Sequence, residues 1–172
     1  MKILRLVLCL TAISAICAGV LASVNAVTKE TIRGIRAQQT LDAAAAVMPS
    51  GVDKVESLKD GVFVGKDAAG KTVGYAVKGS TSAGYGGDIV LMVGFTPDVK
   101  IVSYKKLEAA ETPGLGSNLT SPGFMKQFAG MDASSALAVK KDGGTVEAIT
   151  SATITSRAVC SAINDARGRL PF

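Results

Sequence analysis

The stretch Glu147-Ala148-Ile149-Thr150-Ser151-Ala152-Thr153-Ile154-Thr155-Ser156 joins a short apolar, strand-like run to an amphipathic helix. It is crowded with hydroxyl side chains, on Thr150, Ser151, Thr153, Thr155 and Ser156. The first backbone N–H groups of a helix lack partners within the helix, and the helix dipole places partial positive charge there. The turn is therefore a predicted anion site, suited above all to a phosphate. The simpler alternative is a cluster of N-cap residues without a ligand.

The residues around this turn predict a helix after it and a hairpin before it. Apolar residues after the turn recur on one helical stripe, at Ala158, Val159, Ala162, Ile163 and Ala166. Before the turn, residues 136–140 and 145–149 predict two strands joined by a tight turn at 142–144. Farther upstream, Ser121-Pro122 predicts the start of a short helix, because proline is favoured in a first helical turn.

Residues 52–107 change to short β-like runs separated by turn sequences. Four strands are predicted, over residues 61–64, 71–77, 88–95 and 100–107. Turns at 67–70 and 96–98 join neighbouring strands, and a glycine-rich loop at 79–87 separates the second strand from the third. With the helices, this pattern predicts an α+β fold: an antiparallel sheet packed by helices, with an N-terminal transmembrane helix.

The N-terminal segment predicts a membrane anchor. Residues 6–28 are 23 consecutive residues without a charge, and about 20 helical residues span a bilayer core of roughly 30 Å. A cleaved signal peptide is the competing interpretation, because small residues suited to cleavage occur at Val24-Asn25-Ala26. The length of the run favours a retained anchor over residues 1–27, followed by one domain over residues 28–172. A helical pattern continues from the anchor as far as Pro49.

The start of the chain also indicates an orientation. Its basic residues followed by an apolar run are typical of an export signal, which favours a cytoplasmic N-terminus. The expected location is therefore the inner (cytoplasmic) membrane, crossed once, with the domain on the periplasmic or extracellular side.

Composition excludes several kinds of site. The chain has no histidine, which rules out a His-dependent catalytic triad and a His-ligated zinc or haem. Its three cysteines, Cys9, Cys17 and Cys160, follow no disulfide or metal-binding spacing. The formal net charge is +5, but residues 1–36 hold five basic residues and one acid, a net +4, which leaves +1 for the rest. Without a basic stripe, no nucleic-acid partner is expected.

A second motif, Glu111-Thr112-Pro113-Gly114-Leu115-Gly116, follows the last predicted strand. Pro113 fixes φ, and the two glycines permit positive φ and the close approach of a flat ring. Glu111 and Thr112 add polar groups that could meet the edge of such a ring. The alternative is a tight turn with an exposed glutamate.

The two motifs together resemble those of FMN-binding domains whose FMN is esterified through its phosphate to a threonine. The family motif Asp-x-x-Ser/Thr-Gly-Ala-Thr aligns with residues 147–153, and residues 111–116 match the family form closely. The resemblance implies covalent FMN as the cofactor, attached to Thr153. It implies that further residues contact the cofactor, namely Thr150, Ser151, Ala152, Glu111, Thr112, Gly114 and Leu115.

Three positions depart from the family pattern. Glu147 replaces an aspartate, Ser151 replaces a glycine, and residues 108–110 lack the histidine that the family often has before the second motif. A serine replaces glycine readily where φ is negative and less easily where φ is positive.

One anchor followed by a short domain with a C-terminal FMN motif resembles the G subunit of Rnf complexes. Those complexes move electrons between ferredoxin and NAD and couple this to ion pumping. The resemblance implies an electron-carrier subunit that works with other membrane subunits and needs a flavin transferase, with no catalytic residue or metal site of its own. Alternatives are a C-type subunit of a sodium-pumping quinone reductase, a stand-alone exported flavoprotein and, in another class, a flavin-free membrane assembly module.

Overall fold

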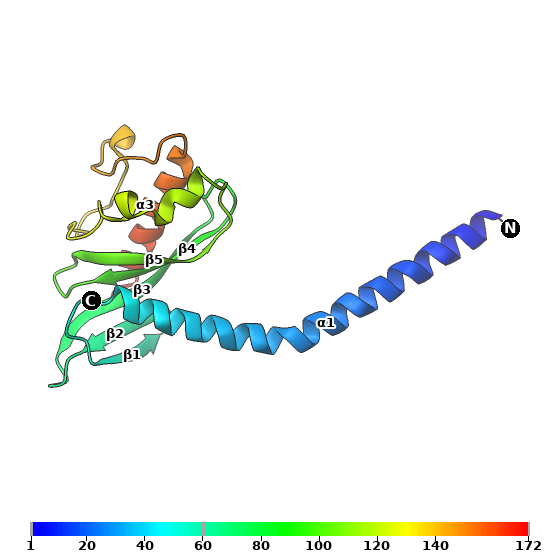
Figure 1. The fold of residues 1–172 in the computed structure, drawn as a ribbon, viewed down its shortest axis with the longest axis horizontal. Coiled ribbons are helices and arrows are strands. Elements are labelled where there is room, and N and C mark those ends of the chain that lie inside the picture. The colour runs from blue at the N-terminus through cyan, green and yellow to red at the C-terminus, as the bar shows by residue number, and fades with distance from the viewer. Residues whose placement is uncertain (1, 60, 172) are drawn as a thin grey trace. The chain divides into compact units, whose positions relative to one another are not determined.

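The computed structural model describes residues 2–59 and 61–171, and the chain divides into two compact units between Gln39 and Thr40. The first unit is most of one long helix, α1 (Lys2–Val47), which begins near the N-terminus in Figure 1. An 18-residue window of α1 has a mean hydropathy of 2.4, so this helix is long and apolar enough to cross a membrane. The helical pattern predicted beyond the anchor is confirmed, since α1 ends just before Pro49.

The second unit is built on a five-stranded antiparallel sheet in which each strand pairs with its neighbours in sequence. The strands are β1 (Lys54–Lys59), β2 (Val62–Lys66), β3 (Thr72–Thr81), β4 (Ile89–Phe95) and β5 (Ile101–Ala109). β2 to β5 confirm the four predicted strands. β1 is not evident in the sequence pattern, because it is rich in charged residues and has no buried position.

Both faces of the sheet are covered, which is why β4 is buried almost throughout. The smaller core lies under the end of α1 and contains Ala43, Ala44, Val47, Met48, Phe63, Ala76 and Met92. The larger core lies under α3 (Thr153–Gly168) and includes Val77, Leu91, Val93, Phe95, Val159 and Ile163. Successive residues of a strand point to opposite faces, so the neighbours Met92 and Val93 belong to different cores. The predicted α+β class is confirmed, and so is the apolar stripe of α3.

β3 continues past its predicted end at Val77 into the glycine-rich stretch, so residues 79–81 are strand and not loop. The reason lies in α3, which packs directly on this part of the strand. A Cβ on Gly79 would overlap the carbonyl oxygen of Ala162 and lie 2.8 Å from the Ala166 Cβ. Glycine is therefore required here for close helix–strand packing and not for a turn.

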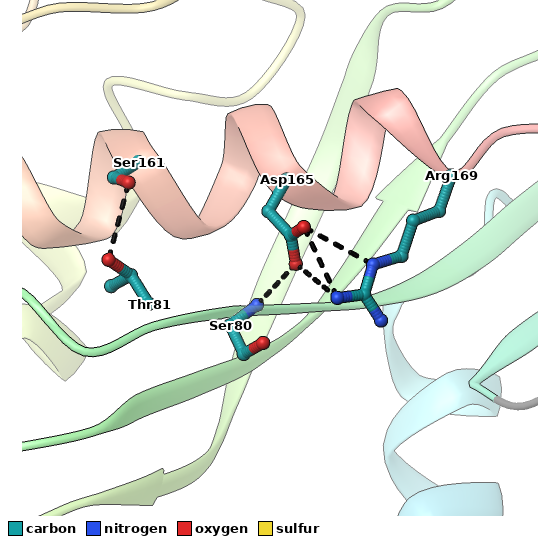
Figure 2. Close-up of polar contacts among 5 residues, drawn as sticks. All are labelled: Ser80, Thr81, Ser161, Asp165 and Arg169. Atoms are coloured by element: carbon teal, nitrogen blue, oxygen red, sulfur yellow. Dashed lines mark hydrogen bonds and ion pairs between the residues drawn. The ribbon is translucent and has the colours of Figure 1, made fainter.

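The same end of α3 is fastened to β3 by polar contacts (Figure 2). The Ser80 N–H donates to Asp165 Oδ2 at 2.8 Å, and Arg169 pairs with the same carboxylate at 2.9 Å. One turn earlier, the Ser161 and Thr81 hydroxyls lie 3.3 Å apart. Polar groups of strand β3 and of the C-terminal half of α3 are thus paired with one another by hydrogen bonds.

The chain between β5 and α3 contains only short helices: η1 (Gly116–Thr120), α2 (Pro122–Met125) and η2 (Lys140–Asp142). α2 confirms the short helix predicted at Ser121-Pro122. It is anchored by aromatic packing, because the Phe128 ring meets both Phe124 and Tyr104 edge-on, with ring centroids 5.4 Å apart in each case.

The hairpin predicted over residues 136–149 is wrong. Val139 and Val146 form one isolated bridge of parallel geometry, with η2 between them. Tertiary contacts replace the expected strand pairing: the Leu137 N–H donates to Asn164 Oδ1 of α3 at 2.8 Å, and the Asn164 amide returns a bond to the Leu137 carbonyl at 2.9 Å. A side chain of α3 therefore takes the place of a partner strand.

Candidate functional site

The first turn of α3 is open. The helix begins at Thr153 with Ala152 as its N-cap, and in the described residues no side chain caps it. The simpler interpretation of this stretch, a cluster of N-cap hydroxyls, is therefore wrong. Ser156 instead braces the approach to the helix: it accepts from the Ile149 N–H and donates to the Ala152 carbonyl, each at 2.9 Å. The first N–H groups of the helix thus remain available to an anion.

Ser151, just before this turn, has a left-handed backbone with φ 61°. This is the position where the motif that the sequence resembles has glycine. A side chain in this region costs about 1–2 kcal/mol relative to a right-handed conformation. The bond from the Ala152 N–H to the Ile149 carbonyl, at 3.0 Å, closes the turn in spite of that cost. The backbone thus keeps a conformation that glycine would adopt without strain.

Glu111 links the segments that surround this helix start. Its Oε2 accepts from the Thr155 hydroxyl at 2.6 Å, and its Oε1 accepts from the Gly86 N–H at 3.2 Å. The carboxylate therefore joins the glycine-rich loop, the loop at residues 111–116 and the first turn of α3.

The two glycines of the second motif have different structural roles. Gly114 has φ +75°, and a Cβ there would meet open space, so this glycine is needed for its backbone conformation. At Gly116 a Cβ would overlap Glu111 Oε2 and lie 2.6 Å from Thr155 Oγ1, so this glycine is needed for close packing. From the sequence, a positive φ and close packing are expected at both glycines. In the structure, Gly114 has the positive φ and Gly116 the close packing.

A cavity of about 420 Å³ opens between these segments. It is lined by Tyr85, Glu111, Thr112, Leu115, Gly116, Ser151, Ala152, Thr153, Ile154 and Thr155. Its volume is within the range of about 300–1,000 Å³ typical of small-molecule sites. Three of its apolar side chains are notably exposed: Tyr85 at 69%, Ile154 at 48% and Leu115 at 42%. An exposed apolar rim of this kind suits a flat ring.

A second hollow of about 620 Å³ adjoins the first and shares Leu115 and Ser151 with it. Of the residues predicted from the sequence to contact a cofactor, six line the first cavity: Glu111, Thr112, Leu115, Ser151, Ala152 and Thr153. The other two, Gly114 and Thr150, line the second. The fold thus brings residues from two distant motifs to one place.

Four residues of the first cavity are absent from the sequence-based set: Tyr85, Gly116, Ile154 and Thr155. Tyr85 is the aromatic residue of the glycine-rich loop. A large aromatic side chain among glycines is the sequence feature that could have indicated its contact with a ligand. Gly116 and Thr155 lie within the two motifs, but their contacts with Glu111 depend on tertiary structure.

The charges lining the two hollows are carboxylates. Glu111 faces the first and Glu147 the second, and the described lining residues include no lysine or arginine. Glu147 is paired with Lys140 Nζ at 2.5 Å, and the hydrogen bond from Lys140 holds the pKa of that carboxyl below its usual value. Among the residues that line the two hollows, the groups suited to an anion are therefore backbone N–H groups and hydroxyls.

Arg157 is the basic residue one helical turn after Thr153. It forms a two-pronged ion pair with Asp142 of η2, with Nε–Oδ2 and Nη2–Oδ1 distances of 2.7 Å. This hydrogen-bonded pair lowers the pKa of Asp142 and raises the pKa of Arg157.

The remaining chemistry of the site is that of hydroxyls and amides. Within residues 2–59 and 61–171, no group of three or more His, Cys, Asp or Glu side chains could hold a metal ion. Cys160 in α3 is buried, and this burial raises the pKa of its thiol to about 11. The arrangement can bind a planar ligand that carries an anionic group, and it offers the Thr153 hydroxyl beside that group.

Comparison with known proteins identifies relatives of this chain. A family model described as an FMN-binding domain matches residues 84–168, a range that includes every residue lining the two hollows. The G subunit of the Na(+)-translocating ferredoxin:NAD(+) oxidoreductase complex of Acetobacterium woodii is 33% identical over 186 residues, covering 94% of this chain and 88% of that protein. The G subunit of the ion-translocating oxidoreductase complex of Methanosarcina acetivorans is 31% identical over 176 residues, covering 96% of this chain and 93% of that protein.

One solved structure agrees with the fold. The crystal structure of NqrC from Shewanella oneidensis matches with a TM-score of 0.52 and 23% sequence identity, over 66% of this chain and 64% of that chain. At this identity the likeness concerns the fold alone.

Proposed function

This chain belongs to the FMN-binding family of G subunits of ion-translocating oxidoreductase complexes, and we propose that it is an electron-carrier subunit of such an Rnf-type complex. In this proposal FMN is attached through its phosphate to the hydroxyl of Thr153. The observation that carries the proposal is the cavity at the uncapped start of α3, which Thr153 lines.

The phosphate end of FMN fits the first turn of α3. The open N–H groups and the helix dipole favour an anion there. The Thr153 hydroxyl lies at the same turn, and in the described part of the chain it has no hydrogen-bond partner, so nothing competes with its modification. By contrast, the Thr155 hydroxyl is engaged by Glu111 and the Ser156 hydroxyl by Ala152. These contacts favour Thr153 over the other two hydroxyls at the start of the helix.

The ring end of FMN fits the exposed apolar rim of the cavity. Tyr85, Leu115 and Ile154 offer apolar surface, and the Thr112 hydroxyl adds a polar group. Gly114 and Thr150 line the adjoining hollow, into which a long ligand would extend. Glu111 holds the cavity wall through Thr155 and Gly86, so we assign it to shaping the site as well as to contact.

A bound FMN would supply the redox chemistry, because a flavin accepts and releases one or two electrons. The residues of this chain contribute by holding the cofactor, orienting it and setting the charge around it. Ser151 and Ala152 keep the turn open beside Thr153, and Glu111 places one negative charge in the cavity wall.

The chain is a membrane-associated protein, since α1 is long and apolar enough to cross a bilayer and its relatives are subunits of ion-translocating complexes. We further propose that α1 crosses the membrane once and that the FMN domain lies on the periplasmic or extracellular side. Other membrane subunits of the complex would be its partners, and a flavin transferase would attach the FMN.

Intact mass measured on the full-length chain tests the covalent cofactor. Protein produced together with a flavin transferase should be heavier by one FMN unit, and its flavin fluorescence should survive denaturing electrophoresis. Thr153→Ala should abolish both signals, whereas Thr150→Ala, in the preceding turn, should keep them. Added mass on Thr150 or Thr155 would place the attachment at another hydroxyl and contradict the assignment.

Electron flow in the assembled complex tests the carrier role. Thr153→Ala should leave the complex assembled, because the domain core does not depend on this side chain. It should stop electron transfer between ferredoxin and NAD, because the FMN would no longer be attached. Normal transfer in a fully assembled, flavin-free complex would replace the carrier role with that of an assembly module.

Protease accessibility tests the membrane arrangement. Protease added to intact spheroplasts should remove the domain after Thr40 and leave a membrane-bound fragment that begins at Met1. Protection of the domain until the cells are lysed would reverse the proposed orientation, and a mature N-terminus near Val27 would identify a cleaved signal.

A further inference from the structure

Arg157 lies close to the proposed attachment site by helix geometry. It follows Thr153 by four residues in α3, and side chains with this spacing are neighbours, with Cβ atoms about 5–6 Å apart. Long side chains in a helix also lean toward its N-terminus. The guanidinium can therefore reach back over the turn that carries Thr153.

The present partner of Arg157 is a surface carboxylate. Asp142 accepts two hydrogen bonds of 2.7 Å from the guanidinium, and the side chains of Arg157 and Asp142 are 50% and 40% exposed. Exposed ion pairs are weak restraints, because water and salt screen them. The same planar fork binds a phosphate as well as a carboxylate. The ion pair therefore positions the Arg157 guanidinium, but it is weak enough for a phosphate to replace Asp142 as the partner.

A phosphate at Thr153 would add negative charge to an already acidic place. Glu111 lies in the cavity wall, and the described residues that line the two hollows carry no basic side chain. Lys140 is paired with Glu147, and Arg169 is paired with Asp165 at the opposite end of α3. Arg157 is the cation whose position on the helix matches the added charge.

We propose that Arg157 exchanges Asp142 for the phosphate once FMN is attached to Thr153. This rests on the proposed function. The Asp142–Arg157 pair is then the resting arrangement of the unmodified chain, and the Arg157–phosphate pair is that of the modified chain. Arg157 is a positioning residue in this scheme, since it fixes the phosphate and hence the direction in which the flavin leaves the helix.

A double-mutant cycle in the two forms of the full-length chain tests the exchange. Asp142→Asn, Arg157→Gln and the double variant are unfolded in urea, with and without prior modification by a flavin transferase. In the unmodified form the two changes should be non-additive, by about 1.4- to 5-fold in the unfolding equilibrium constant, as for exposed ion pairs. In the modified form they should be additive, and Asp142→Asn should have no effect. The same non-additivity in both forms would overturn the exchange.

Phosphorus NMR of the modified chain provides a readout that a purely structural role would not move. Arg157→Gln should shift the phosphodiester resonance away from its wild-type position. Arg157→Lys should give a smaller shift, because lysine keeps the positive charge but lacks the planar guanidinium. Arg167→Gln is the matched control, since Arg167 lies on the same helix and donates to the Ser134 carbonyl at 3.2 Å. An unchanged resonance in Arg157→Gln would overturn the proposal.

These outcomes separate the exchange from the function on which it rests. If intact mass shows no FMN on Thr153 in the wild-type chain, the covalent cofactor itself is wrong and the exchange falls with it. If the mass is present while the coupling between Asp142 and Arg157 persists, only the exchange is wrong.

Discussion

The two ends of α3 differ in how far their polar groups are paired. At the C-terminal end, Asp165 takes up both the Ser80 N–H and the Arg169 guanidinium, and Gly79 lets the strand backbone touch the helix. At the N-terminal end, no side chain among the described residues caps the helix, and a strained Ser151 precedes it. Close packing and paired polar groups are concentrated at the end that packs on β3, and groups available to a ligand are concentrated at the other end.

Breaking the closed end at its tightest point should have the largest effect. Gly79→Ala places a Cβ onto the Ala162 carbonyl oxygen, a backbone atom that cannot move without shifting α3. We expect the free energy of unfolding to fall by about 3 kcal/mol or more. Urea unfolding of the full-length chain measures the change. Gly168→Ala, on the same helix with open space around it, is the control and should be nearly neutral. Equal stabilities of the two variants would show that the contact is not tight.

Removing the polar fastening at the same end should have a smaller effect. Asp165→Ala leaves the Ser80 N–H and Arg169 without their shared acceptor, and should cost about 1–3 kcal/mol in the free energy of unfolding. Asp165→Asn keeps an acceptor for Ser80 and should cost less. Thermal unfolding of both variants distinguishes the two contributions, and an equal loss in both would assign the stability to the ion pair.

Relieving strain at the open end should act in the other direction. Ser151→Gly removes a side chain from a residue at φ 61°, and should raise the free energy of unfolding by about 1 kcal/mol. Ser151→Ala keeps the strain and removes only the hydroxyl, so it should give no such gain. If Ser151→Gly also leaves the fraction of modified Thr153 unchanged, the strain is not needed for attachment. A loss of stability in Ser151→Gly would contradict the strained conformation.

The smallest expected effect is a pH dependence at the Asp142–Arg157 pair. The hydrogen bonds from Arg157 lower the pKa of Asp142 in the folded chain. The ionised Asp142 therefore contributes its full stabilisation at pH values above its pKa in the unfolded chain, about 3.9. The contribution is lost as the pH falls through the lower pKa of the folded chain. The difference in stability between wild type and Asp142→Asn should be constant from neutral pH to about pH 5 and shrink in more acidic solution. A difference that grows toward acid would reverse the sign of the shift.

Much of the fold could be predicted because local patterns dominate it. The uncharged run gives α1, alternating runs bounded by turns give β2 to β5, and small apolar residues on one stripe give α3. β1 escapes this approach because it is an edge strand with a polar sequence. The hairpin before α3 fails because Asn164, distant in sequence, takes the backbone bonds of Leu137 that a strand would have used.

The candidate site could be predicted only where one segment contains the signal. The hydroxyl-rich turn and the Glu111–Gly116 motif identify residues that the fold does bring together. The contact between Glu111 and Thr155 spans 44 residues, and Tyr85 reaches the cavity from a third segment. The positive φ of Ser151 also cannot be read from the residue type, because serine usually avoids it.

The simple strand order has a consequence for the timing of assembly. Each strand pairs with the one before it, so the sheet can grow strand by strand as a nascent chain lengthens. α3 is made after all five strands, yet it completes the larger core and one wall of the cavity. A chain in which α3 is missing or misfolded therefore never presents the finished cavity. Under the proposed function, a cofactor fixed at this helix would also mark the chains in which α3 has folded onto the sheet.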